Sequence, residues 1–151
     1  MPRLKIGDPA PPFSLTTEKG ESVVLSDAIA KGPVVLIFYP MDQTPGCTAQ
    51  LCAVRNDAPR YAEAGVQVFG VNGGDANSHQ RFVARYNLTA PLLVDRGLAT
   101  AAAYDAVVNL GLIRIINRTV VGIGRDGKIA FYKRGSPSTD EILSAVGSAP
   151  V

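Results

Sequence analysis

Tryptophan is absent from this chain of 151 residues, which contains a single histidine and only two cysteines. Two cysteines are too few for a fold built on disulfides and too few for a zinc site made of cysteine alone, and His79 does not complete such a site. A chain without a disulfide framework is expected in the cytoplasm, where thiols stay reduced unless they carry out chemistry.

An excess of one charge and long apolar runs are also missing. The 15 basic and 13 acidic residues leave a net charge of +2, and neither sign collects into a run. Nucleic-acid binding therefore has little support. No stretch approaches the roughly 18 apolar residues that a membrane span needs, and the first residues lack the apolar segment of a signal peptide. We expect a protein that binds no nucleic acid and enters no membrane.

The chain does have enough apolar residues for a sizeable core. Hydrophobic residues make up 46% of it and charged residues 19%, a composition that excludes disorder as the main state. Its length corresponds to about one domain of roughly 100–150 residues. No repeat, linker or low-complexity tract divides it, so the sequence predicts a single domain over residues 1–151.

Extended apolar runs alternate with amphipathic segments, which is typical of an α/β or mixed domain. The run 34–39, stopped by Pro40, predicts a central strand buried on both faces. Short runs at 13–16 and 22–25 predict an N-terminal β-hairpin or two short edge strands. The other expected elements are strands at 66–71 and 91–94, helices at 77–86, 99–104 and 139–146, and a hairpin of 119–123 with 128–132.

The residues that follow the central strand carry the chemistry. Thr44 is a good N-cap and Pro45 suits the first helical position, so we expect a helix with Cys47 in its first turn. The free N–H groups and the dipole of a helix start favour thiolate, the nucleophilic form, over thiol. Free cysteine is often only a small buried apolar residue, and Thr44 has a purely structural role available as a cap. The position and a second cysteine nearby favour a reactive thiol.

Cys52 follows Cys47 by five residues. On an ideal helix this spacing separates the Cα atoms by roughly 8–9 Å, whereas a disulfide tolerates at most about 7 Å. A bond between the two would therefore require the first turns of the helix to unwind or bend. Pro59 removes a helical hydrogen bond farther along and predicts a kink or restart there.

Residues 40–48 resemble the active-site segment of the peroxiredoxins. Pro40, Thr44 and Cys47 match that family's Pro-x-x-x-Thr/Ser-x-x-Cys motif, and Thr-Pro-Gly-Cys-Thr with a cysteine five residues later resembles the bacterioferritin comigratory protein, or peroxiredoxin Q, subfamily. The resemblance extends to residues 7–11, 66–75, 92–95, 118–120 and 126–128. It implies an α/β, thioredoxin-like fold with an N-terminal β-hairpin extension and a central mixed sheet flanked by helices.

The resemblance also implies thiol-dependent reduction of hydrogen peroxide and organic hydroperoxides, without metal, haem or flavin. Cys47 would be the peroxidatic cysteine, which becomes a sulfenic acid, and Cys52 the resolving cysteine of an intramolecular disulfide. A thioredoxin-type dithiol partner would reduce that disulfide. Thr44 would hydrogen-bond the peroxide, and Pro40 would shield the thiolate from water. By residue type alone, Arg118 would be an ordinary charged residue at the start of a strand. The resemblance implies that it holds the thiolate ionised and binds the peroxide oxygens.

Other features beside the motif are open to more than one interpretation. Asp42 brings a carboxylate near Cys47, which disfavours a thiolate unless solvent exposure makes the effect small. We expect His79 to be a surface helix residue with no base or metal role. The segment 110–116 is unusually apolar, and we favour an exposed rim that contacts a partner over an extra strand or core. The protein would then be a monomer or a weak homodimer.

The same cysteine pair is compatible with other functions. A redox sensor or binding module would use the disulfide switch to alter a partner interface. A general disulfide oxidoreductase of the thioredoxin type is less well supported, because that chemistry usually uses Cys-x-x-Cys and four residues intervene here.

Overall fold

The computed structural model describes residues 4–147 and follows the predicted alternation of strands and helices. The strands are β1 (Ser14–Thr17), β2 (Ser22–Val24), β3 (Val34–Phe38), β4 (Gln67–Asn72), β5 (Leu92–Val94), β6 (Val107–Leu110), β7 (Ile113–Ile116), β8 (Thr119–Ile123) and β9 (Ile129–Arg134). The helices are α1 (Leu25–Lys31), α2 (Pro45–Asn56), α3 (Ala58–Glu63), α4 (Ala76–Tyr86), α5 (Ala99–Ala103) and α6 (Thr139–Val146), with a 3₁₀ turn η1 (Arg96–Leu98) before α5.

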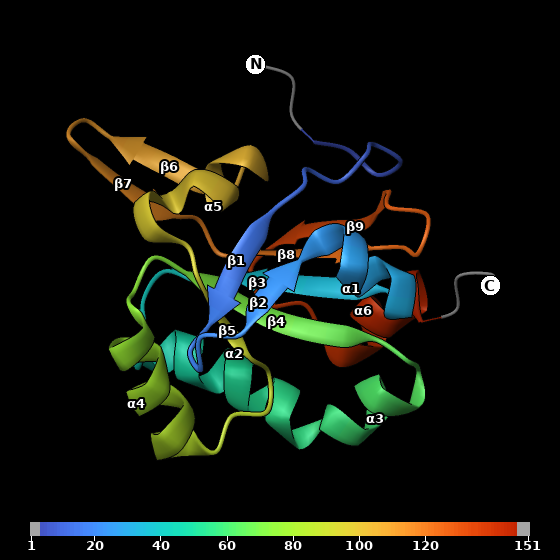
Figure 1. Ribbon diagram of the computed structural model, residues 1–151, viewed down its shortest axis with the longest axis horizontal. Coiled ribbons are helices and arrows are strands. Elements are labelled where there is room, and N and C mark those ends of the chain that lie inside the picture. Colours follow the sequence, from blue (N-terminus) through green and yellow to red (C-terminus); the bar gives the residue numbers. More distant parts are fainter. Residues whose placement is uncertain (1–3, 148–151) are drawn as a thin grey trace.

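Seven of the strands form one mixed sheet in the order β2-β1-β5-β4-β3-β8-β9 (Figure 1). β3 lies inside this sheet, where it pairs in parallel with β4 and antiparallel with β8. All five of its residues are buried, so the predicted strand with two buried faces is confirmed. The predicted N-terminal hairpin is confirmed as well: β1 pairs with β2 and also with β5, which adds both strands to the sheet edge.

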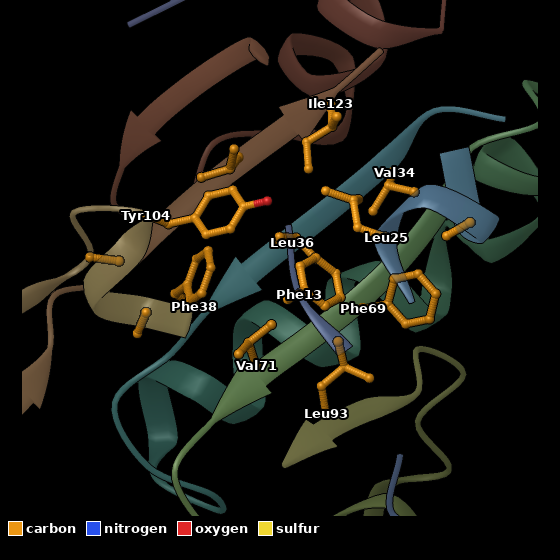
Figure 2. Packing of buried hydrophobic residues seen from close by; sticks show 14 of the residues in the cluster. Phe13, Leu25, Val34, Leu36, Phe38, Phe69, Val71, Leu93, Tyr104 and Ile123 are labelled. Atoms are coloured by element: carbon orange, nitrogen blue, oxygen red, sulfur yellow. The ribbon is translucent and has the colours of Figure 1, made fainter. Parts of the chain in front are cut away.

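Helices cover both faces of the sheet because successive residues of β3 point to opposite sides. Figure 2 shows one of the two cores, in which Phe38 and Tyr104 lie with ring centroids 5.5 Å apart and α1 and α5 supply further apolar residues. The other core joins α2, α3, α4 and α6 to the opposite face, through residues such as Leu51, Phe82 and Ile142. The predicted central mixed sheet flanked by helices is therefore confirmed.

Pro59 restarts the helix, as the sequence predicted. α2 ends at Asn56, α3 begins at Ala58, and Pro59 occupies the first turn of α3. A proline is tolerated there because the first N–H groups of a helix have no helical partner. The helix that carries both cysteines is consequently short.

The segment around 110–116 is a hairpin that extends from the body of the molecule (Figure 1). β6 and β7 pair only with each other, as a separate two-stranded sheet. Leu112 is fully exposed, and Leu110, Ile113 and Ile115 are exposed as well. The expectation of an exposed segment is confirmed. A strand in this segment was expected only if the segment were buried, which was the disfavoured interpretation.

Candidate active site

Cys47 lies where the sequence predicted, in the first turn of α2. The chain leaves β3, turns through residues 39–44 and enters the helix at Pro45. Thr44 is extended, with φ −78° and ψ 152°, and its carbonyl accepts the first helical hydrogen bond from the N–H of Thr48 at 2.8 Å. The Cys47 side chain is fully buried.

The Thr44 side chain does not cap the helix, which corrects the capping role expected for it. No side-chain hydrogen bond caps α2; the Thr44 hydroxyl donates instead to the carbonyl oxygen of Met41 at 3.0 Å. The first-turn N–H groups of Gly46 and Cys47 therefore have no capping side chain. They are free to donate to an anionic sulfur or oxygen.

Arg118 contacts the sulfur directly. Its Nη2 donates to Cys47 Sγ at 3.2 Å, although 71 positions separate the two residues in the sequence. Strand pairing explains this contact, because Thr119 of β8 lies opposite Phe38 of β3 and brings Arg118 to the end of the sheet where α2 begins. A guanidinium that donates to sulfur stabilises the thiolate by charge as well as by hydrogen bonding.

Gln50 holds Arg118 in place, and sequence reasoning missed this residue. Its Oε1 accepts from Arg118 Nη1 at 2.6 Å, and the side chain is buried. Gly46 leaves room for the guanidinium, since a Cβ there would lie 3.1 Å from Arg118 Nη2. The available signal was spacing: Gln50 follows Cys47 by three residues and thus shares its helix face.

Replacing Gln50 with Ala is expected to slow the oxidation of Cys47 by peroxide about tenfold, because a small misplacement of a catalytic group has a large effect on rate. Stopped-flow kinetics would measure it. Gln50→Glu keeps an acceptor for Arg118 but adds a negative charge near the thiolate, so it should recover only part of the rate, and Gln80→Ala on α4 serves as a control. A Gln50→Ala protein with the wild-type rate would contradict the positioning role.

Neither cysteine is in a disulfide; Cys52 is half-buried, whereas Cys47 is fully buried. Both lie in the same continuous helix, so the structure has the helical spacing that does not permit a disulfide. The far end of α2 is held by Arg55, whose Nη1 donates to the carbonyl oxygen of Tyr86 at the end of α4. Any unwinding would therefore affect the start of the helix and not its end.

Pro40 is exposed, and its backbone is held by Asn72. The Asn72 amide, at the end of β4, donates to the carbonyl oxygens of Tyr39 and Pro40, both at 2.8 Å. The turn between β3 and α2 is thus attached to the neighbouring strand. The shielding role expected for Pro40 stays a prediction.

His79 is fully buried, so the expectation of a surface residue was wrong. Its Nδ1 lies 2.6 Å from Asp42 Oδ2, and the Asp42 side chain is only 5% exposed. Solvent exposure therefore does not weaken the Asp42 charge. The sequence contained a signal: His79 precedes Phe82 by three residues and so lies on the apolar face of α4.

Asp42 is nonetheless ionised at neutral pH. Burial raises the pKa of its carboxyl group, but hydrogen bonds from His79, Ser78 and Tyr39 lower it, and the net direction is below the usual value. The carboxylate therefore lies close to the active-site turn as a buried negative charge with three side-chain donors.

The chain is similar in sequence and in structure to known peroxiredoxins. Residues 6–132 match the model of the AhpC/TSA family. The chain is 47% identical over 91 residues to a chloroplastic peroxiredoxin Q of Triticum aestivum, a match that covers 60% of this chain and 42% of the wheat protein. It is 35% identical over 131 residues to a peroxiredoxin bcp of Coxiella burnetii, covering 84% of this chain and 86% of that protein. The crystal structure of peroxidoxin BcpB from Mycobacterium tuberculosis superposes with a TM-score of 0.90 at 28% identity, over 99% of this chain and 100% of that one.

The match to the wheat relative thus spans less than half of that relative's length, whereas the bacterial matches cover most or all of both chains. The structural match also confirms the thioredoxin-like fold that the motif implied. The resemblance to peroxiredoxin Q and bacterioferritin comigratory protein is confirmed, and the chain belongs to the AhpC/TSA family.

Proposed function

We propose that this protein is a thiol-dependent peroxidase in which Cys47 reduces hydrogen peroxide and organic hydroperoxides. The contact that carries the proposal is the 3.2 Å hydrogen bond from Arg118 to the Cys47 sulfur at an uncapped helix start. A cation and free N–H groups together favour a thiolate and also bind the peroxide oxygens. The peroxiredoxin names of its relatives support the same activity.

In the proposed reaction, the Cys47 thiolate attacks one peroxide oxygen. The S–O bond forms as the O–O bond breaks, and the departing oxygen takes a proton and leaves as water or an alcohol. The Cys52 thiol then condenses with the sulfenic acid, which releases water and forms the disulfide. A thioredoxin-type dithiol returns the disulfide to two thiols by exchange. Thr44 would hydrogen-bond the peroxide, and Pro40 would exclude water.

A hollow beside the reactive turn supports substrates with an apolar group. It has a volume of about 400 Å³ and borders Gly46 and Gln50, next to the Arg118 guanidinium. Its walls are largely apolar and include Ile37, Ala49, Ala53, Val54, Val120 and Ile142. A small alkyl hydroperoxide fits this surface better than a charged substrate does.

Oxidation is expected to unwind the start of α2. In diamide-treated protein, a Cys47–Cys52 bond requires Cα atoms closer than the helix allows, so amide protection should fall over residues 46–51. Hydrogen exchange with mass spectrometry would measure it, with α4 as the internal reference. The Cys52→Ser protein cannot form the bond and should keep its protection. A Cys47–Cys52 bond with unchanged exchange would contradict the geometry.

The compartment and the reductant are also part of the proposal. Within residues 4–147, no helix is long and apolar enough to cross a bilayer. A cytosolic location follows from the sparse use of cysteine, whereas the plant relatives are named as chloroplastic. A thioredoxin-type protein is proposed as reductant because a disulfide formed in an unwound helix is open to attack by a partner thiol.

The exposed hairpin β6–β7 supports a weak homodimer. A two-stranded sheet is marginally stable alone, and contiguous exposed apolar residues often mark an interface. Light scattering should give a mass that rises with concentration above the 15.9 kDa monomer. Ile113→Lys should abolish the rise, whereas Ile6→Lys, at another exposed apolar residue, should not. A monomer at all concentrations and redox states would contradict the dimer.

Anaerobic addition of hydrogen peroxide to the reduced protein tests the activity itself. We expect about one equivalent to be consumed in a fast step, with loss of both thiols. Slow consumption together with oxidation-dependent binding of a partner would instead favour the redox-sensor function.

A further inference from the structure

A buried polar cluster lies beneath the active-site turn. Asp42 accepts hydrogen bonds from the Tyr39 hydroxyl, the Ser78 hydroxyl and His79 Nδ1, each at 2.6 Å. The other ring nitrogen of His79, Nε2, lies 3.1 Å from the carbonyl oxygen of Leu93 in β5. The cluster therefore connects the turn after β3 to α4 and β5. The mechanism proposed above does not use it.

The partners of His79 define its protonation state. The Leu93 carbonyl oxygen can only accept, so Nε2 must carry a proton. Nδ1 faces a carboxylate at 2.6 Å, and the lowered pKa of Asp42 keeps that group ionised. Donation from Nδ1 to this carboxylate would make the ring an imidazolium, and the pair would then carry no net charge.

The Gly74 backbone packs closely over the pair, since a Cβ there would lie 3.1 Å from Asp42 Oδ2 and 3.3 Å from His79 Cε1. His79 is fully buried, whereas Asp42, Gly74 and Ser78 also border a hollow of about 560 Å³. Without His79, the Asp42 charge would be left buried with only the two hydroxyl donors.

Tyr39 hydrogen-bonds to Asp42 and lies in the same buried cluster as Cys47. Burial raises the pKa of the Tyr39 hydroxyl, and the nearby charges of Asp42, Cys47 and Glu18 raise it further. Asp42 and Cys47 are thus both close enough to Tyr39 to act on it. The turn itself connects them too, because the Thr44 hydroxyl is bonded to the carbonyl oxygen of Met41, next to Asp42.

We propose that His79 is a positioning residue for Cys47: its imidazolium neutralises Asp42 and holds the turn 40–44 against β5. The inference rests on the proposed peroxidase function but concerns a residue that does not touch the substrate. The other titratable groups that act on Tyr39 are Cys47 from α2 and Glu18 from the β1–β2 turn, and Arg114 of β7 borders the same hollow as Asp42. Glu18 is itself held by the backbone N–H of Leu92 at 2.9 Å.

Variants in a Cys52→Ser background test the charge. His79→Asn keeps a donor toward Asp42 but leaves the carboxylate uncompensated, so the pH midpoint of Cys47 alkylation by iodoacetamide should rise by about one unit. Peroxide oxidation near pH 7 should slow about tenfold and recover at higher pH.

Asp42→Asn should leave the midpoint of Cys47 alkylation close to that of the Cys52→Ser background. The double variant Asp42→Asn/His79→Asn should restore it, because the uncompensated charge is gone. Arg81→Gln, which removes an exposed charge from α4, is the control.

A second measurement needs no variant. The chain contains one histidine, so ¹⁵N NMR of the native protein reads its ring alone. Both ring nitrogens should be protonated at neutral pH; a neutral ring would overturn the inference, as would an unchanged alkylation midpoint in His79→Asn. Alkylation does not require peroxide. A wild-type protein that fails to consume peroxide would therefore refute the peroxidase function while this test of His79 still gives a result.

Discussion

Replacing Cys47 with Ser is expected to abolish peroxide consumption, with a loss of at least about a thousandfold in rate. A serine hydroxyl stays protonated at neutral pH, so the helix start and Arg118 would have no thiolate to stabilise, and the nucleophile would be lost. A stopped-flow or peroxide-electrode assay under anaerobic conditions would measure the effect.

Cys52→Ser is the matched control for that experiment. Cys52 is half-buried and does not contact the Cys47 sulfur, so its loss should leave the first oxidation intact while blocking disulfide formation and recycling. Trapping of a Cys47 sulfenic acid in this variant would show where the reaction stops. A fully active Cys47→Ser protein would refute the mechanism.

Replacing Arg118 with Met is expected to slow Cys47 oxidation by roughly a hundredfold to a thousandfold, the range for loss of one strong donor to a developing charge. Arg118 donates to the sulfur and is anchored by Gln50, so its loss removes both a charge and a hydrogen bond. The pH midpoint of Cys47 alkylation should rise as well. Peroxide kinetics and alkylation kinetics, measured from pH 5 to 9, would report the two effects separately.

Two comparisons make the Arg118 result specific. Arg118→Lys keeps the charge but replaces the two nitrogens that contact Gln50 and Cys47 by a single one without the planar fork, so it should recover only part of the rate. Arg125→Met removes an exposed cation from the β8–β9 hairpin and should leave the rate unchanged. An Arg118→Met protein that reacts at the wild-type rate would show that the contact is structural.

Local patterns predicted most of the secondary structure. A continuous run of β-branched and aromatic residues favours a strand buried inside a sheet, and Thr44-Pro45 favours a helix start, so β3 and the start of α2 follow from short-range rules. The single-domain organisation stays a prediction. A strand at 110–116 was expected only if the segment were buried, whereas the structure shows strand pairing with most of its apolar residues exposed.

The candidate site was predicted in part. The motif pointed to Pro40, Thr44 and Cys47, and the resemblance pointed to Arg118; the structure places Arg118 on the Cys47 sulfur, and the catalytic roles of all four stay predictions. Gln50 and His79 were missed because their roles depend on partners distant in the sequence: Gln50 meets Arg118 68 positions away, and His79 meets Asp42 37 positions away. The capping bond expected of Thr44 was also wrong, since its hydroxyl bonds to Met41 instead.

The sequence by itself determined that this chain carries two cysteines and no more, with one at the start of a helix and the other five residues along it. The position of the helix start depends on residues close together in the chain, because local sterics and hydrogen bonding decide where a helix begins. Only the tertiary structure decided which cation reaches the sulfur, which residue anchors that cation, and that the lone histidine is buried against a carboxylate. These contacts depend on strand order and helix packing, which bring distant residues within hydrogen-bond range and which no local spacing encodes.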